Sequence, residues 1–445
     1  MARSFTEALD AQPVRPFQWM IAGVCMLVLV CDGIDLQLLG IVAPLVIESF
    51  GTDPSTFGIA AGAALVGFGL GSFAGGVLGD AIGRRWTLAI AALVFSLSTV
   101  GAASAGDVTQ MALWRLAGGL GFGGAYANAL ALAGEWLPER WRGVTVSTLS
   151  VGTPIGGTIV GLIGPGMAAD YGWDGTFLRI GLATTLLAVV IVVALRDSPA
   201  FLLALGKREQ AQKNARFVLD TDEELAPERH EADGVEGQRT SVFDKRNLRL
   251  NIGIGLAFTA AAMVAYSILT WTTTMLTARG FTLADAGGAV ALAGITSMVG
   301  SVLVGLAMRR FGSHRVLLAI SIVLTCVLVA LAIQVEALPE APDALEQQVV
   351  TWLVGAAGGF FSAAIAGMYV LMTFGYPQSC RSSGIGFGIF MSRIGAIGGS
   401  ALGGALLELG GASTWPFFAI LVVCAIVISG ASLVINRHVP PLGKR

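Results

Sequence analysis

Charge is scarce in this 445-residue chain. Asp, Glu, Lys and Arg make up 13% of it, against about 25% in a typical soluble domain. Apolar residues make up 55%, and the mean hydropathy is +0.76. This shortage of charge excludes an ordinary soluble protein and indicates a membrane protein. We therefore expect a lipid bilayer, and no nucleic acid, among its partners.

Cysteine and histidine are also rare. The five cysteines form no Cys-x-x-Cys pair, and the three histidines lie in separate polar stretches, so the chain offers no disulfide or metal framework. The apolar stretches contain no set of nucleophile and base either. We therefore expect no cofactor, no metal site and no enzymatic activity.

Long apolar segments are what the chain has instead. A helix needs about 20 apolar residues to cross a bilayer, and the first segment is too long for the core of a cleavable signal peptide. Twelve candidate spans lie at residues 17–46, 57–79, 86–105, 109–134, 144–168, 176–195, 250–275, 284–308, 316–335, 349–375, 382–407 and 415–435. The expected fold class is an all-α membrane protein with twelve transmembrane helices.

A polar stretch divides these spans into six and six. We expect an N-terminal bundle at residues 1–195, a cytoplasmic linker at 196–249 and a C-terminal bundle at 250–445. A short basic loop follows a glycine-rich helix at the same place in each half, GVLGDAIGRR after the second span and GLAMRRFGSHR after the eighth. This repetition predicts two pseudo-symmetric six-helix bundles with a polar site between them.

The positive charges are distributed unevenly between the loops. Lys and Arg favour cytoplasmic loops. With the N-terminus inside, all of them fall on the cytoplasmic side except Arg115 and Arg393, within spans, and Arg179 and Arg279, outside. We therefore expect a multi-pass protein of the inner or plasma membrane with both termini in the cytoplasm.

Four charged side chains lie deep within the predicted spans, namely Asp32, Asp35, Arg115 and Arg393. A charge in hydrocarbon costs at least about 2.5–3.5 kcal/mol, so four of them indicate a polar interior with a task. The two acids and two bases can cancel as a set. We interpret the task as moving an anionic solute across the membrane together with protons.

Asp32 and Asp35 are three residues apart and share one helix face. Two neighbouring carboxylates in a low dielectric resist ionising together, so one of them can take up a proton outside and release it inside. Arg115 has a similar expected depth, and we predict a proton-sensitive pairing between it and one of the acids. The alternatives are a purely structural ion pair and an Arg115 that extends to the outer interface.

Arg393 is twelve residues beyond Arg381 in the eleventh span. That distance is about 18 Å along a helix and places Arg393 near the middle of the membrane. A guanidinium binds a carboxylate through two parallel hydrogen bonds, so we predict that Arg393 receives the carboxylate of the substrate. The alternative is a structural hydrogen bond to helix carbonyls.

Several motifs carry a family resemblance. The loop GVLGDAIGRR resembles the loop between spans two and three of the major facilitator superfamily, at Gly76, Asp80, Gly83, Arg84 and Arg85. Three more stretches are similar to the aromatic acid:proton symporter family within it: DGIDLQLLG in span one, RLAGGLGFGGAYANALALAGEWLPERWR in span four and RSSGIGFGIFMSRIGAIGG in span eleven. The resemblance covers the whole chain and implies the major facilitator fold.

The resemblance also implies where the substrate binds, because spans one, four, seven and ten line the cavity in this superfamily. Candidates to hold the substrate ring, on the last three of these spans, are Tyr126, Tyr266, Trp271, Phe360, Phe361 and Tyr369. Asn128 is a candidate to hydrogen-bond a ring hydroxyl. The alternatives are a membrane-interface belt for Trp271 and interhelical hydrogen bonding for Asn128.

A charged network is expected at the inner end of span four. In the implied fold Glu135 and Arg142 lie close to Asp80, Arg84 and Arg85. We predict that these five residues form a cytoplasmic gate that assembles and breaks. The alternative is a set of solvated loop charges.

Together these features predict a proton-coupled symporter that imports a small aromatic carboxylate by alternating access, working as a monomer. Three alternatives remain open: a proton-coupled carrier of a non-aromatic organic acid, a drug:proton antiporter and a sensor that binds a solute without moving it. An antiporter would need a cation-binding acid in place of Arg393.

Overall fold

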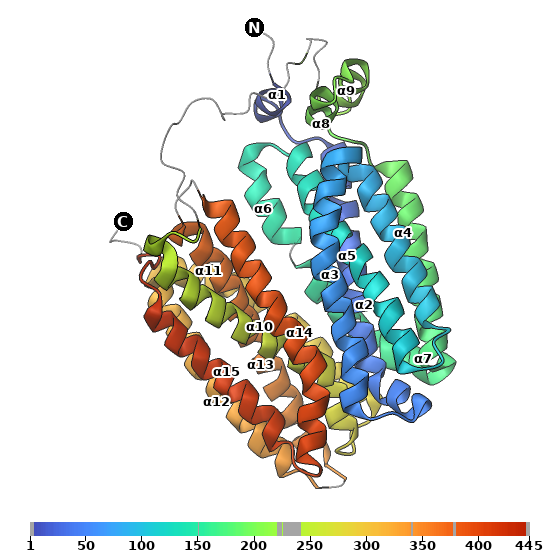
Figure 1. The fold of residues 1–445 in the computed structure, drawn as a ribbon, viewed down its shortest axis with the longest axis vertical. Helices are drawn as coiled ribbons and strands as arrows, with labels where there is room; N and C mark the ends of the chain where they lie inside the picture. Colours follow the sequence, from blue (N-terminus) through green and yellow to red (C-terminus); the bar gives the residue numbers. More distant parts are fainter. Residues whose placement is uncertain are drawn as a thin grey trace.

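The computed structural model describes residues 4–149, 151–219, 225, 242–339, 341–376 and 380–441, without the side chains of 142–144, 146, 147, 381 and 382. The described part consists of helices joined by short turns, with no β-strand (Figure 1). The first half contains α1 (Phe5–Asp10), α2 (Pro16–Phe50), α3 (Pro54–Ile82), α4 (Arg84–Ala102), α5 (Val108–Trp136), α6 (Glu139–Leu149), α7 (Gly152–Ala194), α8 (Pro199–Ala204) and α9 (Arg208–Ala215). The second half contains α10 (Leu248–Thr277), α11 (Leu283–Phe311), α12 (Ser313–Glu336), α13 (Ala344–Gly375), α14 (Arg381–Gly410) and α15 (Trp415–Val434). Residues 220–224 and 226–241 of the expected linker lie outside this description.

Helix α7 is long enough to cross a bilayer twice. Its 43 residues would extend for about 65 Å, but Gly172 has φ +72° and breaks the helix into two. The described residues contain eleven helices that are long and apolar enough to span, so the two parts of α7 bring the number of crossings to twelve. The expected all-α fold with twelve spans is confirmed. The expected fifth span, 144–168, is not one helix, because α6 ends at Leu149 and α7 begins at Gly152.

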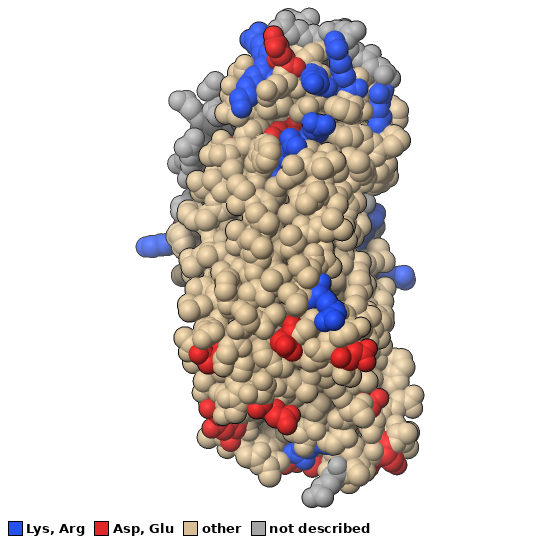
Figure 2. Space-filling model, turned by 90° about the vertical axis from the view of Figure 1, so that its right-hand side faces the viewer, with Lys and Arg blue, Asp and Glu red and all other residues tan. Residues whose placement is uncertain are grey.

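The two ends of the molecule carry opposite charge. Both termini lie at one end (Figure 1), where Lys and Arg gather, whereas Asp and Glu gather at the other (Figure 2). We call these the basic end, marked by Arg84, Arg140, Lys207, Arg208 and Arg309, and the acidic end, marked by Asp53, Asp107, Asp285, Glu336 and Asp343. This polarity matches the uneven distribution of basic loops in the sequence.

Helix capping explains several of the acids at the acidic end. Helices α3, α5 and α13 all begin there, and their N-cap residues Asp53, Asp107 and Asp343 each accept a hydrogen bond from a backbone N–H three residues on, at 2.7–2.8 Å. A carboxylate at this position satisfies a free N–H and interacts favourably with the helix dipole. Hydrogen bonds from Ser55 and Thr56 lower the pKa of Asp53 to about 2.

The turns at the basic end repeat between the halves. Gly83 joins α3 to α4 with φ +102°, and Gly312 joins α11 to α12 with φ +85°, a conformation that only glycine adopts freely. In each half the segment after the last helix packs on this turn. Asp197 accepts a hydrogen bond from the Arg85 N–H at 3.2 Å, and the Val439 carbonyl accepts one from the Ser313 N–H at 3.0 Å.

The two halves pack against each other near the acidic end, through α2 with α10, α3 with α14 and α7 with α11. The backbones nearly touch: a Cβ on Gly58 would collide with the Ala401 carbonyl, and the Thr273 hydroxyl donates to the Gly40 carbonyl. The ribbons of the two halves diverge toward the basic end (Figure 1). The acidic end is therefore the closed end of the molecule.

We expect Gly58→Leu to prevent this closure, because the new side chain would occupy the space of the Ala401 backbone. Gly69→Leu, on the same helix, is the matched control, since a Cβ there meets nothing within 4 Å. The measurement is labelling of a single cysteine at Thr270, in a background without native cysteines, by a membrane-impermeant thiol reagent applied from the acidic end. Labelling should increase several-fold in the Gly58 variant alone. Equal labelling in both variants would show that close approach of α3 and α14 does not seal this end.

Candidate functional site

Asp35 and Arg115 form a buried ion pair within the first half. The Arg115 Nη1 lies 2.5 Å from Asp35 Oδ2, and its Nη2 donates to the Asp35 carbonyl at 3.1 Å. Thr99 of α4 donates to the other carboxylate oxygen at 2.6 Å. Both charged side chains are almost fully buried, so Arg115 does not extend to the membrane interface. The carboxylate of Asp35 is thus saturated by a cation and a hydroxyl.

Asp32 has a different environment, although it lies less than one turn away on α2. Its Oδ2 accepts a hydrogen bond from Thr153 of α7 at 3.2 Å, while its Oδ1 is buried without any hydrogen-bond partner. No cation lies within ion-pair distance of it among the described residues. Of the two acids, only Asp32 has an oxygen free to take a proton.

Arg393 connects the two halves. Its guanidinium lies over the ring of Phe68 of α3, 3.9 Å from the centroid, and its Nη1 is 3.5 Å from the Tyr266 hydroxyl of α10. A cation over an aromatic face is stabilised by about 0.5–2 kcal/mol, which holds the side chain in place without neutralising it. Arg393 forms no ion pair within the described part of the chain, so its charge is available to an anion.

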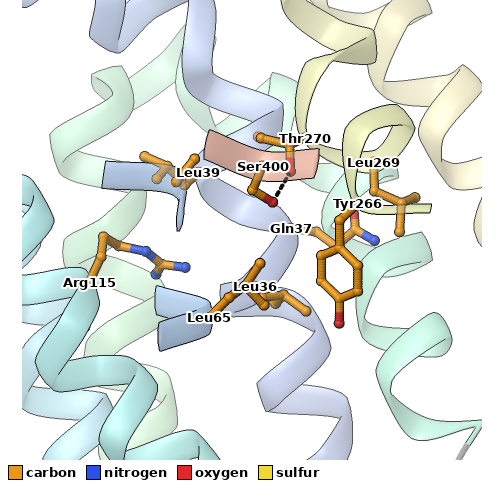
Figure 3. Close-up of a pocket in the computed structure, with 11 residues that line it drawn as sticks. Leu36, Gln37, Leu39, Leu65, Arg115, Tyr266, Leu269, Thr270 and Ser400 are labelled. Atoms are coloured by element: carbon orange, nitrogen blue, oxygen red, sulfur yellow. Dashed lines mark hydrogen bonds between the residues drawn. The ribbon is translucent and has the colours of Figure 1, made fainter. Parts of the chain in front are cut away.

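A small cavity of about 20 Å³ lies between the halves beside these residues (Figure 3). It is lined from α2 by Leu36, Gln37, Leu39 and Gly40, from α3 by Ala61 and Leu65, from α5 by Arg115, from α10 by Tyr266, Leu269 and Thr270, and from α14 by Ser400. This volume accommodates about one water molecule. The packing of the two halves at the acidic end therefore extends as far as the site.

The structure brings some of the expected aromatic residues to the site and not others. Tyr126 packs against Phe68 with centroids 5.7 Å apart. Tyr369 is 41% exposed. Its ring packs edge-to-face on Phe258 of α10, with centroids 5.1 Å apart. Of these tyrosines, Tyr266 contacts the Arg393 guanidinium directly, and Tyr126 packs against Phe68, whose ring lies under that guanidinium.

The remaining aromatic candidates lie elsewhere. Trp271 is fully buried and stacks edge-to-face on Phe57 of the opposite half at 5.9 Å, so a membrane-interface belt is the wrong description, and it helps to close the acidic end. Phe361 is buried in the core of the second half, and Phe360 packs against that core. Neither has a described contact with Arg393.

Asn128 connects α5 to α3. Its amide nitrogen donates to the carbonyls of Gly75 and Gly124, both at 2.8 Å, and a Cβ on Gly79 would collide with its side-chain oxygen. The buried amide therefore acts as an interhelical hydrogen bond in this conformation.

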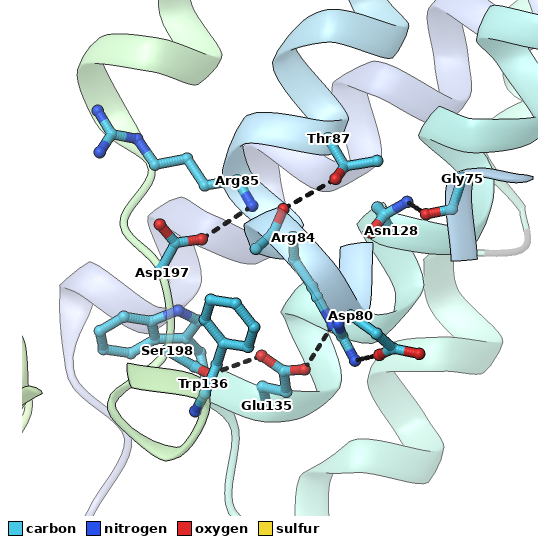
Figure 4. A network of polar contacts seen from close by, with 12 residues as sticks. Gly75, Asp80, Arg84, Arg85, Thr87, Asn128, Glu135, Trp136, Asp197 and Ser198 are labelled. Carbon is cyan, nitrogen blue, oxygen red and sulfur yellow. Dashed lines mark hydrogen bonds and ion pairs between the residues drawn. The ribbon is translucent and has the colours of Figure 1, made fainter. Parts of the chain in front are cut away.

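The charged residues at the basic end form a network within the first half (Figure 4). Arg84 lies between two acids, 2.5 Å from Asp80 Oδ1 and 2.9 Å from Glu135 Oε1. Ser198, which follows α7, donates to the other oxygen of Glu135 at 2.6 Å. The network therefore ties α3, α4 and α5 to the chain segment that leaves the sixth span.

Arg85 takes part through different atoms. Its backbone N–H binds Asp197, while its guanidinium donates to the Val192 carbonyl at 2.5 Å. Burial raises the pKa of Asp197 above its ordinary value, against the opposing effect of the Arg85 hydrogen bond. The side chain of Arg142 lies outside the described residues. No described contact joins this network to the second half.

Several residues of the site were not predicted from the sequence. Thr99 and Thr153, which bind the two acids, are single hydroxyls of α4 and α7 that lie outside the charged motifs. Phe68 lies in an apolar run where nothing distinguishes it from lipid-facing neighbours. Gln37 stands two residues beyond Asp35, and its polarity within an apolar run was the one available signal. No group of three or more His, Cys, Asp or Glu side chains that could hold a metal occurs in the described part.

Comparison with known proteins extends these observations. Residues 25–341 match the model of the Major Facilitator Superfamily. The 4-hydroxybenzoate transporter PcaK of Acinetobacter baylyi is 27% identical, covering 96% of this chain and 94% of that protein. The gallate transporter of Pseudomonas putida is also 27% identical, over 90% and 88% of the two chains, and the benzoate transport protein of Acinetobacter baylyi is 24% identical, over 97% and 92%.

Solved structures have the same fold. The xylose transporter XylE from E. coli, in a partially occluded inward open conformation, superposes with a TM-score of 0.72 at 16% identity, over 95% of this chain and 99% of that one. A bacterial homologue of the lysosomal transporter Spinster gives 0.72 at 15% identity, over 95% and 97%. The predicted fold and the predicted resemblance to aromatic acid transporters are confirmed, as is the prediction of a transporter rather than an enzyme. With its family model matched over most of its length, this multi-pass membrane protein belongs to the Major Facilitator Superfamily.

Proposed function

We propose that this protein is a proton-coupled symporter that imports an aromatic carboxylate by alternating access. The observation that carries the proposal is Arg393, a guanidinium between the halves that contacts the ring of Phe68 and the hydroxyl of Tyr266 and has no acidic partner in the described structure. A carboxylate would supply the missing charge, and the surrounding rings suit an aromatic body. The relatives named for 4-hydroxybenzoate, gallate and benzoate support this substrate class.

The orientation follows from the charge of the two ends. Basic loops favour the cytoplasm, so the basic end and both termini face the cytoplasm and the protein resides in the inner membrane. The closed acidic end then faces outward, and this conformation is the one that releases substrate inside. Because both halves of a single chain supply the site, one copy is sufficient, and the protein acts as a monomer.

Charge balance supplies a mechanism for coupling. Asp32, Asp35, Arg115 and Arg393 have a net charge of zero when all four are ionised. A bound carboxylate makes the total −1, and a proton on Asp32 restores zero. Carriers that are empty and deprotonated, or loaded and protonated, are therefore neutral and can reorient, whereas the intermediate states carry a charge that is costly to move through a closed site. One proton accompanies one monoanion.

Each half contributes a distinct part to this cycle. Asp35 and Arg115 hold α2 against α5, Asp32 carries the proton, and Arg393 holds the carboxylate. Tyr126, Tyr266 and Tyr369 contact the ring. The network of Asp80, Arg84, Arg85 and Glu135 stiffens the first half at its cytoplasmic end, and Arg142 belongs to the same gate.

We expect Arg393→Lys to weaken binding of benzoate by about 10–100-fold, because lysine keeps the charge but loses the two-point contact. Binding is measured by isothermal titration of the purified protein. The unfolding temperature should stay close to that of the wild type, since Arg393 forms no ion pair in the described structure. Arg310→Lys, an exposed residue at the basic end, is the matched control and should bind as the wild type does.

Benzamide separates carboxylate recognition from ring recognition. The wild type should bind it at least tenfold more weakly than benzoate, because the amide cannot form a charge-assisted pair. Equal affinity for the two compounds would contradict the assignment of Arg393. Binding of cationic drugs in place of benzoate would favour the antiporter, and binding of benzoate without uptake into proteoliposomes would favour the sensor.

A further inference from the structure

Gln37 is a buried amide that the proposed transport cycle does not use. It is only 8% exposed, and its side-chain oxygen has no hydrogen-bond partner. A buried acceptor without a donor is unfavourable unless something fills that place during function. Such an atom next to a proposed binding site points to a ligand group.

The free oxygen has few directions in which to find a donor. On the α7 side the amide packs closely against the backbone of Gly157. A Cβ added at Gly157 would lie only 2.9 Å from the amide nitrogen. On the opposite side Gln37 lines the cavity between the halves, which it shares with Tyr266, Thr270 and Ser400 (Figure 3). The hydroxyls of Thr270 and Ser400 already lie 3.1 Å from each other. The cavity, which has the volume of about one water molecule, therefore offers the amide a place to accept a hydrogen bond from a single hydroxyl group.

Tyr266 relates this cavity to Arg393. Its ring lines the cavity, and its hydroxyl lies 3.5 Å from the Arg393 guanidinium. Along α14, Ser400 is seven residues beyond Arg393, or about 10 Å toward the acidic end. Because Gln37 and Tyr266 line the same cavity, a ring that lies along Tyr266 with its carboxylate on Arg393 can reach this cavity with its far edge.

We propose that the Gln37 side-chain oxygen accepts a hydrogen bond from a hydroxyl on the substrate ring, opposite the carboxylate, and so selects phenolic acids over unsubstituted ones. This proposal rests on the proposed function and adds the substrate class. A site with a buried acceptor rejects an analogue that lacks the matching donor, because the acceptor is then left unpaired. A methoxy group fills the same place but cannot donate, so it is rejected as well.

The test compares 4-hydroxybenzoate, benzoate and 4-methoxybenzoate by isothermal titration of the purified full-length protein. We expect the wild type to bind the hydroxylated acid about tenfold more tightly than either analogue. Gln37→Met, which keeps the length of the side chain and removes the acceptor, should bind 4-hydroxybenzoate and benzoate equally. Gln348→Leu, at an exposed position of α13, is the control and should keep the preference.

Two results would overturn the proposal while leaving aromatic acid transport intact. One is a wild type that binds benzoate but shows no preference for the hydroxylated acid, which needs no variant to fold. The other is a Gln37→Met protein that keeps the full preference. A wild type that binds none of the three acids overturns the proposed function, and the role of Gln37 with it.

Discussion

Replacing Asp35 with Asn is expected to destabilise the protein by about 3–5 kcal/mol, the usual effect of removing one partner from a buried ion pair. Arg115 would remain almost fully buried with its charge uncompensated, since Asp35 provides its only ion pair in the described structure. The measurement is the unfolding temperature of the purified protein in detergent, together with the yield of folded protein. We expect both to fall sharply.

Two further variants make this result specific. Asp53→Asn is the matched control, because Asn caps a helix nearly as well as Asp and the half-buried Asp53 forms no ion pair in the described structure. The double variant Asp35→Asn/Arg115→Gln removes the orphaned charge and should recover part of the lost stability. An Asp35→Asn protein as stable as the wild type would show that the pair is not structural.

Asp32→Asn is expected to abolish accumulation of the substrate against its gradient while leaving exchange intact. Asn imitates the protonated acid, so the loaded site stays neutral and can reorient. The empty site acquires a charge of +1 and cannot return, because moving an uncompensated charge through the closed site is costly. The fold should tolerate the change, since Asn can still accept the hydrogen bond from Thr153.

Proteoliposomes with an acidic exterior measure both activities. Net uptake of radiolabelled 4-hydroxybenzoate driven by the pH gradient should disappear in Asp32→Asn. Counterflow into vesicles preloaded with unlabelled substrate should continue at a rate comparable to that of the wild type. Asp32→Glu keeps a titratable group and should retain part of the accumulation. Proton-driven accumulation by the Asn variant would remove Asp32 from the coupling mechanism.

The expected effects of Asp35→Asn and Asp32→Asn differ, although the two residues have similar surroundings in the sequence. Asp32 and Asp35 share a helix face, and the sequence offered no reason to prefer one for pairing with Arg115. The structure separates them through their neighbours: Thr99 and Arg115 saturate Asp35, whereas Asp32 has one hydrogen bond from Thr153 and a free oxygen. The contacts of Asp35 fit the structural alternative considered for the pair, and we propose Asp32 for the proton-carrying role.

Other expectations depended on where a side chain points around its helix. Trp271, Phe360 and Phe361 lie on the spans that line the cavity in this superfamily, but Trp271 packs into the closed acidic end and the two phenylalanines pack in or against the core of the second half. Phe68 was not among the candidates, yet its ring lies under Arg393. Glycine-rich transmembrane helices are apolar on all sides, so the sequence carries no periodic signal that reveals which face is turned inward.

The amino-acid sequence by itself determined the membrane class, the twelve crossings and the charge polarity of the two ends, because hydrocarbon imposes length and composition on every segment that enters it. It also identified the four embedded charges, because each is costly wherever the helix lies. Which acid meets Arg115, which rings surround Arg393 and where Gln37 points were decided by tertiary packing. Those contacts join helices that are distant in sequence. The rotation of each helix about its axis is fixed only when the helix backbones meet, at sites such as Gly58 and Gly40.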